Sequence, residues 1–135
     1  MVAIGESALA WQCVANIIQN RWNDKRDSWS NVSSIVQIVS NKAQFNAYGG
    51  TLYYQCMNYL DNRTGSNALY EELIETVMPY YMLQGEDILD GAVLYYSPNS
   101  MVPAGSTTGW ENNSQLEEVF VAGIDSNSFR FYKYK

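Results

Sequence analysis

The first strong pattern in the chain is an apolar stripe over residues 8–22. Apolar side chains recur there at steps of three and four residues, and the alanines between them add helix propensity. The stripe consists of Trp11, Val14, Ile18 and Trp22. One face of a helix over 8–22 is therefore expected to be buried, and the polar residues 23–28 are expected to form a loop.

Two further segments show helical spacing of their apolar residues. Residues 30–40 place valines and isoleucines on one face, which favours a helix, although so many β-branched residues also suit a strand. Residues 52–60 repeat the helical spacing with tyrosine, cysteine, methionine and leucine. Residues 41–50 lie between them, end in two glycines and contain Phe45 and Tyr48. We expect a loop there, whose aromatic rings border a binding site.

A long helix is predicted over residues 68–82. Ser66 and Asn67 are candidate N-caps for this helix, and two glutamates follow in its first turns, where the helix dipole favours them. Pro79 removes a backbone donor near the other end, so it is expected to kink the helix or to end it.

The last third of the chain changes to patterns typical of strands. The run "DGAVLYYSPNS", residues 90–100, is short and apolar and closes with Ser-Pro-Asn, which predicts a buried strand or a turn. Residues 119–122 and 128–134 flank a Gly-Ile-Asp-Ser-Asn turn, which predicts a β-hairpin. The expected fold is thus α+β, mainly helical with a small C-terminal β-hairpin.

Length and composition indicate one folded domain over residues 1–135. Of these residues 47% are apolar and 16% charged, the opposite of a disordered segment. Eleven tyrosines and four tryptophans either fill the core or line a cleft that binds flat apolar faces, such as those of sugars. The net charge of −6 argues against binding nucleic acid through its phosphates. The chain has no histidine, so carboxylates must perform any acid–base chemistry.

Cys13 and Cys56 are expected to be small buried hydrophobes, because unpaired cysteines pack readily inside proteins. A disulfide would need their Cα atoms within about 7 Å of each other, and the sequence leaves that alternative open. The chain shows no basic-plus-apolar signal segment and no apolar run of about 18 residues. We therefore expect neither an export signal nor a membrane span.

Glu6 stands at the start of the first predicted helix, directly after Gly5 and before Trp11. A carboxylate there interacts favourably with the helix dipole, so a capping role is the simplest interpretation. Apolar neighbours would instead raise the pKa of this carboxyl by desolvation, and it could then act as a general acid near neutral pH. At the other end of the helix, Asn20 and Arg21 are expected to hold the helix end by bonding to a carbonyl or a carboxylate.

Several short motifs, taken in their order along the chain, resemble the SleB-type cell-wall hydrolases, the spore-cortex lytic enzymes. A Gly-Glu pair, Gly5-Glu6, opens a helix, and an Asn-Arg pair, Asn20-Arg21, ends it. A valine-rich segment then leads into Gln44-Phe45. The aromatic run 91–98 opens with Gly-Ala and ends at proline, and Trp110 precedes the terminal hairpin. The resemblance spans nearly the whole chain.

This resemblance implies a lysozyme-like catalytic domain that cleaves the β-1,4 bond between N-acetylmuramic acid and N-acetylglucosamine. It places the family's catalytic glutamate at Glu6. The chain departs from the family in two places: its terminal "GIDSNSFRFY" lacks the family's histidine, and "TLYYQCMNYLDNRTG", residues 51–65, has no family counterpart. The second departure affects the expected specificity for the muropeptide.

The sequence leaves two mechanisms open. An ordinary glycosidase pairs its acid with a second carboxylate, and spacing singles out none of the residues of suitable type. These are Asp24, Asp27, Asp61, Glu71, Glu72, Asp87 and Asp90. In the other mechanism the substrate's own N-acetyl group or C6 hydroxyl attacks, which gives a 1,6-anhydro product. We favour this second mechanism, that of a lytic transglycosylase, over a muramidase that uses water, as in phage endolysins, and over a non-catalytic peptidoglycan-binding module.

Five residues are candidates for contacting the glycan. Gln44 is expected to bond to an acetamido group with Phe45 beneath it, or else to be a loop residue beside a core ring. Tyr95 and Tyr96 are neighbours in a predicted strand, so at most one of them lines the cleft. Trp110 either stacks on a sugar ring or plugs the core. The expected partner is a peptidoglycan strand, without nucleic acid, membrane insertion, metal or cofactor, and we expect a monomer acting on cell wall or cortex.

Overall fold

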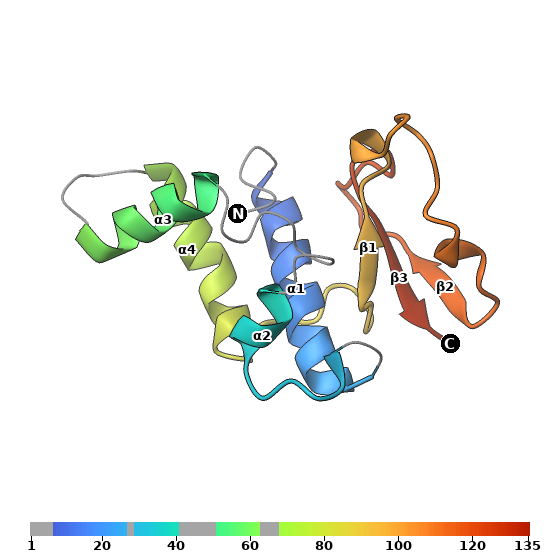
Figure 1. Cartoon of the computed structure of the whole chain (residues 1–135), viewed down its shortest axis with the longest axis horizontal. Helices are drawn as coiled ribbons and strands as arrows, with labels where there is room; N and C mark the ends of the chain where they lie inside the picture. Colours follow the sequence, from blue (N-terminus) through green and yellow to red (C-terminus); the bar gives the residue numbers. More distant parts are fainter. Residues whose placement is uncertain (1–6, 27–28, 41–50, 63–67) are drawn as a thin grey trace.

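The computed structural model describes residues 7–26, 29–40, 51–62 and 68–135 (Figure 1). Within these ranges the helices are α1 (Ala8–Asp24), α2 (Ile35–Val39), α3 (Thr51–Asn62) and α4 (Ala68–Tyr81). The strands are β1 (Leu94–Tyr96), β2 (Leu116–Val119) and β3 (Arg130–Tyr134), and two short 3-10 helices are η2 (Pro98–Ser100) and η3 (Trp110–Asn112). The α+β class is confirmed. Helix α1 lies between the other helices on one side and the sheet on the other (Figure 1).

Helix α1 has well-defined ends. The Ser7 side chain caps its start by accepting a hydrogen bond from the backbone N–H of Ala10 at 3.3 Å. Its end is closed by Lys25 in the left-handed conformation, with φ of 58°, whose N–H bonds to the carbonyl of Arg21 at 3.3 Å. The predicted helix over 8–22 is confirmed and extends two residues further, to Asp24.

The helix predicted over residues 30–40 is wrong in its extent, because the structure forms only α2, Ile35–Val39. Serines define its start. The side chain of Ser34 accepts a hydrogen bond from the backbone N–H of Gln37, and the Gln37 side chain accepts one from the N–H of Ser33 at 2.6 Å. Side chains of this kind compete with the helical hydrogen-bond pattern and favour capping positions. The strand alternative for this segment is excluded.

The later helices agree with the sequence pattern. Helix α3 extends the predicted 52–60 by one residue at its start and two at its end, and α4 matches 68–82 to within one residue. Pro79 lies inside α4, which ends two residues later, so the proline acts near the end of the helix. The candidate caps Ser66 and Asn67 and the loop 41–50 lie outside the described residues.

The sheet contains three antiparallel strands in the described part of the chain, in the order β1-β3-β2. The predicted hairpin is present, but its first strand lies earlier in the chain than the expected residues 119–122. Strand β2 runs over Leu116–Val119 and ends where Val119 pairs with Phe131, so residues 120–122 are not part of a strand. Asp125 closes the connecting turn, since its carbonyl accepts hydrogen bonds from the N–H groups of Ser128 and Phe129. The run at 90–100 supplies the third strand, β1, on the other edge of β3.

The main core forms where α1 meets the sheet. Its buried residues are Ala10, Trp11, Cys13, Ile17, Leu89, Ala92, Phe129 and Phe131. Cys13 is fully buried and unpaired, as expected, and burial raises the pKa of its thiol to about 11. The Cys56 side chain lies outside the description. None of the described helices is both long enough and apolar enough to cross a membrane.

We predict that Phe131→Ala lowers the free energy of unfolding by about 3–5 kcal/mol, because it opens a cavity between α1 and the sheet. Phe120→Ala is the matched control, since the Phe120 ring is 75% exposed. Urea denaturation followed by far-UV circular dichroism measures both. Equal losses in the two variants would contradict the assignment of Phe131 to the core.

Candidate functional site

The described residues contain part of the expected site. Glu6, Gln44 and Phe45 lie outside the described residues, whereas Tyr95, Tyr96 and Trp110 are all placed. The described part of the site is therefore the sheet with its flanking segments and the helix α1 that packs against it.

Tyr95 and Tyr96 point to opposite faces of the sheet, as the alternation of a strand requires. Tyr95 faces α1, with its ring 6.1 Å from the Phe129 ring and 6.4 Å from the Phe131 ring. Burial raises the pKa of Tyr95 to about 12, although the nearby guanidinium of Arg21 acts in the opposite direction.

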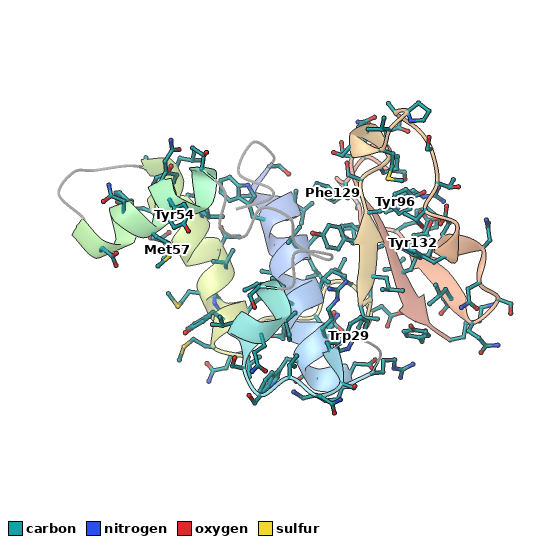
Figure 2. The ribbon with its side chains drawn as sticks, in the orientation of Figure 1. Trp29, Tyr54, Met57, Tyr96, Phe129 and Tyr132 are labelled. Atoms are coloured by element: carbon teal, nitrogen blue, oxygen red, sulfur yellow. The ribbon has the colours of Figure 1, made fainter. Side chains whose placement is uncertain are left out.

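Tyr96 and Trp110 come together on the other face of the sheet, where they pack with Tyr132. Figure 2 shows Tyr96 and Tyr132 on the side of the sheet away from α1. The Trp110 ring meets the Tyr96 ring edge-on at 5.7 Å and the Tyr132 ring edge-on at 5.2 Å. Tyr96 and Tyr132 are stacked with their centroids 6.3 Å apart. We call Tyr96, Trp110 and Tyr132 the outer aromatic cluster. Trp110 covers the other two rings and remains partly exposed, so it combines a packing role with a solvent-facing surface.

An ion pair borders the outer aromatic cluster. Arg130 donates two hydrogen bonds of 2.7 Å to the two carboxylate oxygens of Glu118, and this pairing raises the pKa of the guanidinium. A third donor of Arg130, Nη1, lies 3.4 Å from the Tyr96 hydroxyl. The ion pair ties the neighbouring strands β2 and β3 together.

The hydroxyl of Tyr132 is buried and has no hydrogen-bond partner within the described parts of the chain. Burial raises the pKa of Tyr132 to about 12, and the Glu118 carboxylate acts in the same direction. A buried hydroxyl without a partner loses its hydrogen bonds to water and gains none in the protein.

Asn20 and Arg21 hold the end of α1 against the chain segment that enters β1, as expected from the sequence. The Asn20 amide donates hydrogen bonds to the carbonyl of Ala92 at 2.9 Å and to Asp87 Oδ1 at 3.2 Å. The Arg21 Nε donates to the carbonyl of Val93 at 2.7 Å, and its guanidinium lies 4.8 Å from the centre of the Trp29 ring. We call the two bonds to Ala92 and Val93 the α1–β1 clamp.

Two more buried amides of α1 extend this arrangement, and sequence reasoning missed them. Gln19 pairs with the backbone of Gly85 in both directions, at 2.9 Å each. Asn16 accepts a hydrogen bond from the N–H of Ile88 at 2.8 Å and donates to Asn20. Their spacing was a usable signal, because residues 16, 19 and 20 lie on one side of the helix, away from the apolar stripe.

Most of the candidate second carboxylates already bind other groups. Asp87 accepts hydrogen bonds from Asn20 and from the backbone N–H groups of Leu89 and Gly91. Asp90 pairs with Lys133, Asp24 with Arg26, and Glu71 accepts a hydrogen bond from Tyr59. Asp61 and Glu72 are exposed, and Asp27 lies outside the described residues. Within the described ranges, no three Asp, Glu or Cys side chains gather closely enough to hold a metal ion.

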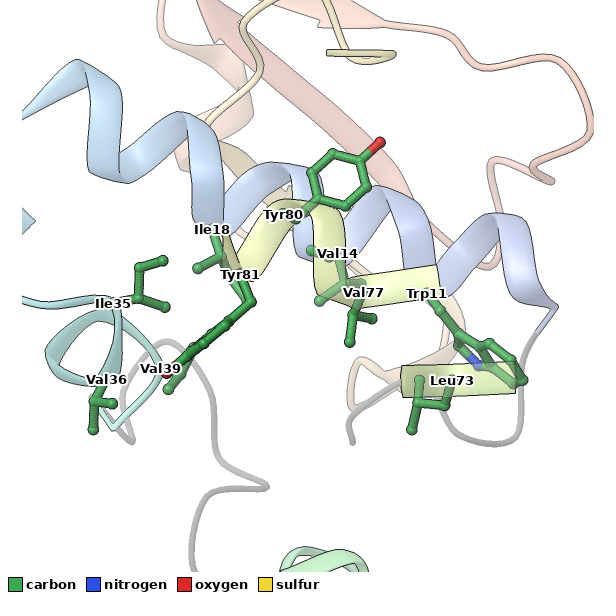
Figure 3. A pocket seen from close by; sticks show the side chains of 11 residues that line it. Trp11, Val14, Ile18, Ile35, Val36, Val39, Leu73, Val77, Tyr80 and Tyr81 are labelled. Carbon is green, nitrogen blue, oxygen red and sulfur yellow. The ribbon is translucent and has the colours of Figure 1, made fainter. Parts of the chain in front are cut away.

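The pocket that the structure shows has a different character. It has a volume of about 250 Å³, lies between α1, α2 and α4, and is lined by apolar and aromatic side chains (Figure 3). The Tyr80 hydroxyl on its border accepts a hydrogen bond from Gln12 and donates one to the carbonyl of Glu86. None of the described residues that line the pocket carries a carboxylate.

Comparisons with known proteins give no family: no protein-family model matches the chain, and neither a curated protein nor a solved structure matches it.

We predict that Asn20→Ala lowers the free energy of unfolding by about 1–3 kcal/mol, because it leaves the buried carbonyl of Ala92 without its donor. Asn112→Ala, at an exposed position of η3, is the control and should stay within about 0.5 kcal/mol of the parent protein. Chemical denaturation measures both values. An unaffected Asn20→Ala protein would show that the clamp contributes nothing to stability.

Replacing Tyr132 and Tyr80 by phenylalanine, one at a time, should have opposite effects on the free energy of unfolding. Tyr132→Phe should leave the free energy of unfolding unchanged or raise it by up to about 1 kcal/mol, because the Tyr132 hydroxyl is buried without a partner in the described structure. Tyr80→Phe should lower it by about 1 kcal/mol, because two hydrogen bonds are lost. Thermal and urea denaturation at pH near 7 test this pair.

The Tyr132 substitution also predicts a change in pH dependence. The folded-state pKa of Tyr132 is about 12, above the ordinary value of 10.0, so the unfolded chain releases this proton first and stability is lost as pH rises from 10 to 12. Tyr132→Phe should therefore flatten the decline of stability over that interval. An unchanged slope would contradict the raised pKa.

Proposed function

We propose that this protein is a peptidoglycan-degrading glycosidase with a lysozyme-like catalytic domain. It would cleave the β-1,4 bond between N-acetylmuramic acid and N-acetylglucosamine, with Glu6 as the general acid. The observation that carries this proposal is the α1–β1 clamp. It joins two of the motifs behind the family resemblance, Asn20-Arg21 and the run 91–98, although the bonded residues are 72 positions apart in the chain.

The place of Glu6 in the chain also supports the proposal. Glu6 directly precedes Ser7, which caps α1, and α1 is fixed by the core on one face and by buried amides at its far end. The helix that follows Glu6 in the chain therefore keeps a constant position relative to the sheet. A general acid must lie within hydrogen-bonding distance of the glycosidic oxygen to transfer its proton, so a fixed helix beside it favours catalysis.

The proposed reaction needs one acid from the protein. Protonated Glu6 donates its proton to the oxygen of the leaving N-acetylglucosamine as the bond to C1 of N-acetylmuramic acid breaks. The C6 hydroxyl of the muramic acid then bonds to C1 and returns a proton to Glu6, which leaves a 1,6-anhydro end. The engagement of Asp24, Asp87 and Asp90 with other groups favours this mechanism over one that needs a second carboxylate.

The aromatic candidates divide between the two faces of the sheet. Tyr95 lies on the face toward α1, where its ring packs against Phe129 and Phe131, so we assign it to the core and not to a glycan contact. Tyr96 and Trp110 lie on the other face of the sheet. A glycan chain would contact this face at sugars away from the bond that is cleaved, through the solvent-facing part of Trp110.

Digestion of purified peptidoglycan tests the proposal. The parent protein should solubilise it and release fragments with 1,6-anhydro-muramic ends, seen by mass spectrometry. Glu6→Gln should reduce the rate at least about 100-fold, because general acid catalysis is lost. Glu75→Gln, at an exposed position of α4, is the matched control and should retain the parent rate.

The fragments also separate the alternatives. New reducing ends would show hydrolysis by water and replace the transglycosylase mechanism with that of a muramidase. Equal activity in Glu6→Gln would exclude Glu6 as the acid. Binding to peptidoglycan without solubilising either cortex or vegetative material would replace the proposed enzyme with a non-catalytic peptidoglycan-binding module.

A further inference from the structure

Asp90 and Gly91 form a tight turn in the segment that leads from α4 to β1. The N–H of Ala92 donates a hydrogen bond to the carbonyl of Leu89 at 3.0 Å, and the two residues between them have positive φ, 50° for Asp90 and 82° for Gly91. Positive φ at both central positions is the mark of a type I′ turn, for which Asp-Gly is a preferred pair. The backbone of the turn therefore explains why this dipeptide occupies it.

The same dipeptide is chemically reactive. An aspartate followed by glycine rearranges more readily than other aspartates, because glycine has no side chain to keep its backbone nitrogen away from the preceding carboxyl. The sequence contains one Asp-Gly pair and no Asn-Gly pair. The Asp90 side chain is 76% exposed, and a Cβ added at Gly91 would meet no atom within 4 Å beyond its chain neighbours. The surroundings thus leave room for ring closure and for water.

We propose that Asp90 is a site of spontaneous covalent modification, at which it converts to isoaspartate through a succinimide. The backbone nitrogen of Gly91 bonds to Cγ of the protonated Asp90 carboxyl, and the carboxyl hydroxyl leaves with the N–H proton as water. Water then adds to the ring. If it breaks the bond from the nitrogen to the original backbone carbonyl carbon, the main chain runs through Cγ and residue 90 is isoaspartate. If it breaks the new bond, aspartate is restored, and neither route needs another reactant.

Two contacts of the folded protein oppose the first step. The Gly91 N–H donates a hydrogen bond to Asp87 Oδ2 at 2.8 Å, which holds this amide toward Asp87. The Asp90 carboxylate pairs with Lys133, which favours its ionised form, and an ionised carboxylate is a poor target for a nucleophile. We therefore expect the rearrangement to start from conformations in which these contacts are open.

The modification would change the main chain directly before the α1–β1 clamp. Isoaspartate adds one carbon to the backbone at residue 90, and the acceptors of the clamp are the nearby carbonyls of Ala92 and Val93. A longer chain at the turn would displace these carbonyls from their donors on α1. The modified protein should consequently be less stable than the unmodified one. This inference is independent of the proposed glycosidase activity.

Incubation of the whole protein at neutral pH, followed by proteolysis and mass spectrometry with electron-transfer fragmentation, measures isoaspartate at residue 90. Protein kept unfolded in urea should convert at least about fivefold faster than folded protein, since loss of one hydrogen bond alone corresponds to about that factor. Asp90→Glu should give no such product at this position, because glutamate would have to close a larger ring.

Three substitutions test the two contacts in the folded protein. Asp87→Ala removes the acceptor of the Gly91 N–H and should speed conversion about fivefold. Lys133→Gln removes the ion pair and should speed it about twofold, the scale of an exposed pair. Lys135→Gln makes the same change in net charge at an exposed position and should leave the rate unchanged. Far-UV circular dichroism checks folding, and Lys133→Gln decides if Asp87→Ala does not fold.

Several outcomes would overturn the proposal: no isoaspartate at residue 90 in either folded or unfolded protein, equal rates in the two states, or rates in the folded variants equal to that of the parent. A modified fraction that unfolds at the same urea concentration as the unmodified protein would contradict the effect on the clamp. Because Glu6→Gln should leave all these rates unchanged, failure of this proposal and failure of the proposed catalysis are distinguishable.

Discussion

Hydrogen bonds from α1 to the chain segment before and within the run 91–98 hold this structure together. That segment crosses from the helices to the sheet, and its backbone groups are buried against α1, where a carbonyl or N–H without a partner would destabilise the fold. Asn20 and Arg21 supply donors to Ala92 and Val93, and Asn16 accepts from Ile88. These bonds allow an irregular segment to lie in the interior, and they fix the direction in which β1 begins.

The position of β1 determines the environment of the aromatic residues. Once β1 is paired with β3, the two faces of the sheet have different neighbours: Tyr95 faces the core formed with α1, and Tyr96 faces Trp110 and Tyr132. A shift of one residue in this pairing would exchange the two tyrosines. The same strand therefore supplies one ring, Tyr95, to the core against α1 and another, Tyr96, which is only 7% exposed, to the outer aromatic cluster.

Helix α1 is covered on more than one side. One side packs against the sheet through Cys13 and Ile17, and the side toward α2 and α4 lines the apolar pocket with Val14 and Ile18. Trp11 contributes to both, because it packs in the main core and also lines the pocket. The buried amides of α1 bond to the chain segment between α4 and β1.

The sequence by itself determined the α+β class, the existence of each helix and the opposite orientation of Tyr95 and Tyr96. These follow from local rules, namely helical periodicity, capping chemistry and strand alternation, which need no knowledge of distant contacts. It also predicted that Asn20 and Arg21 bind backbone or carboxylate groups. Only the tertiary structure decided which groups these are, because Ala92 and Val93 are 72 positions away.

The shifted hairpin and the third strand also needed tertiary information, because strand pairing with β3 selects Leu116–Val119 over residues 119–122. The extent of α2 is a different case, since local serine side chains limit its start. The apolar pocket likewise depends on how three helices meet, since no local pattern separates a side chain that fills a core from one that lines an opening. Sequence patterns record which face of an element is apolar, but the packing of elements decides whether that face is covered.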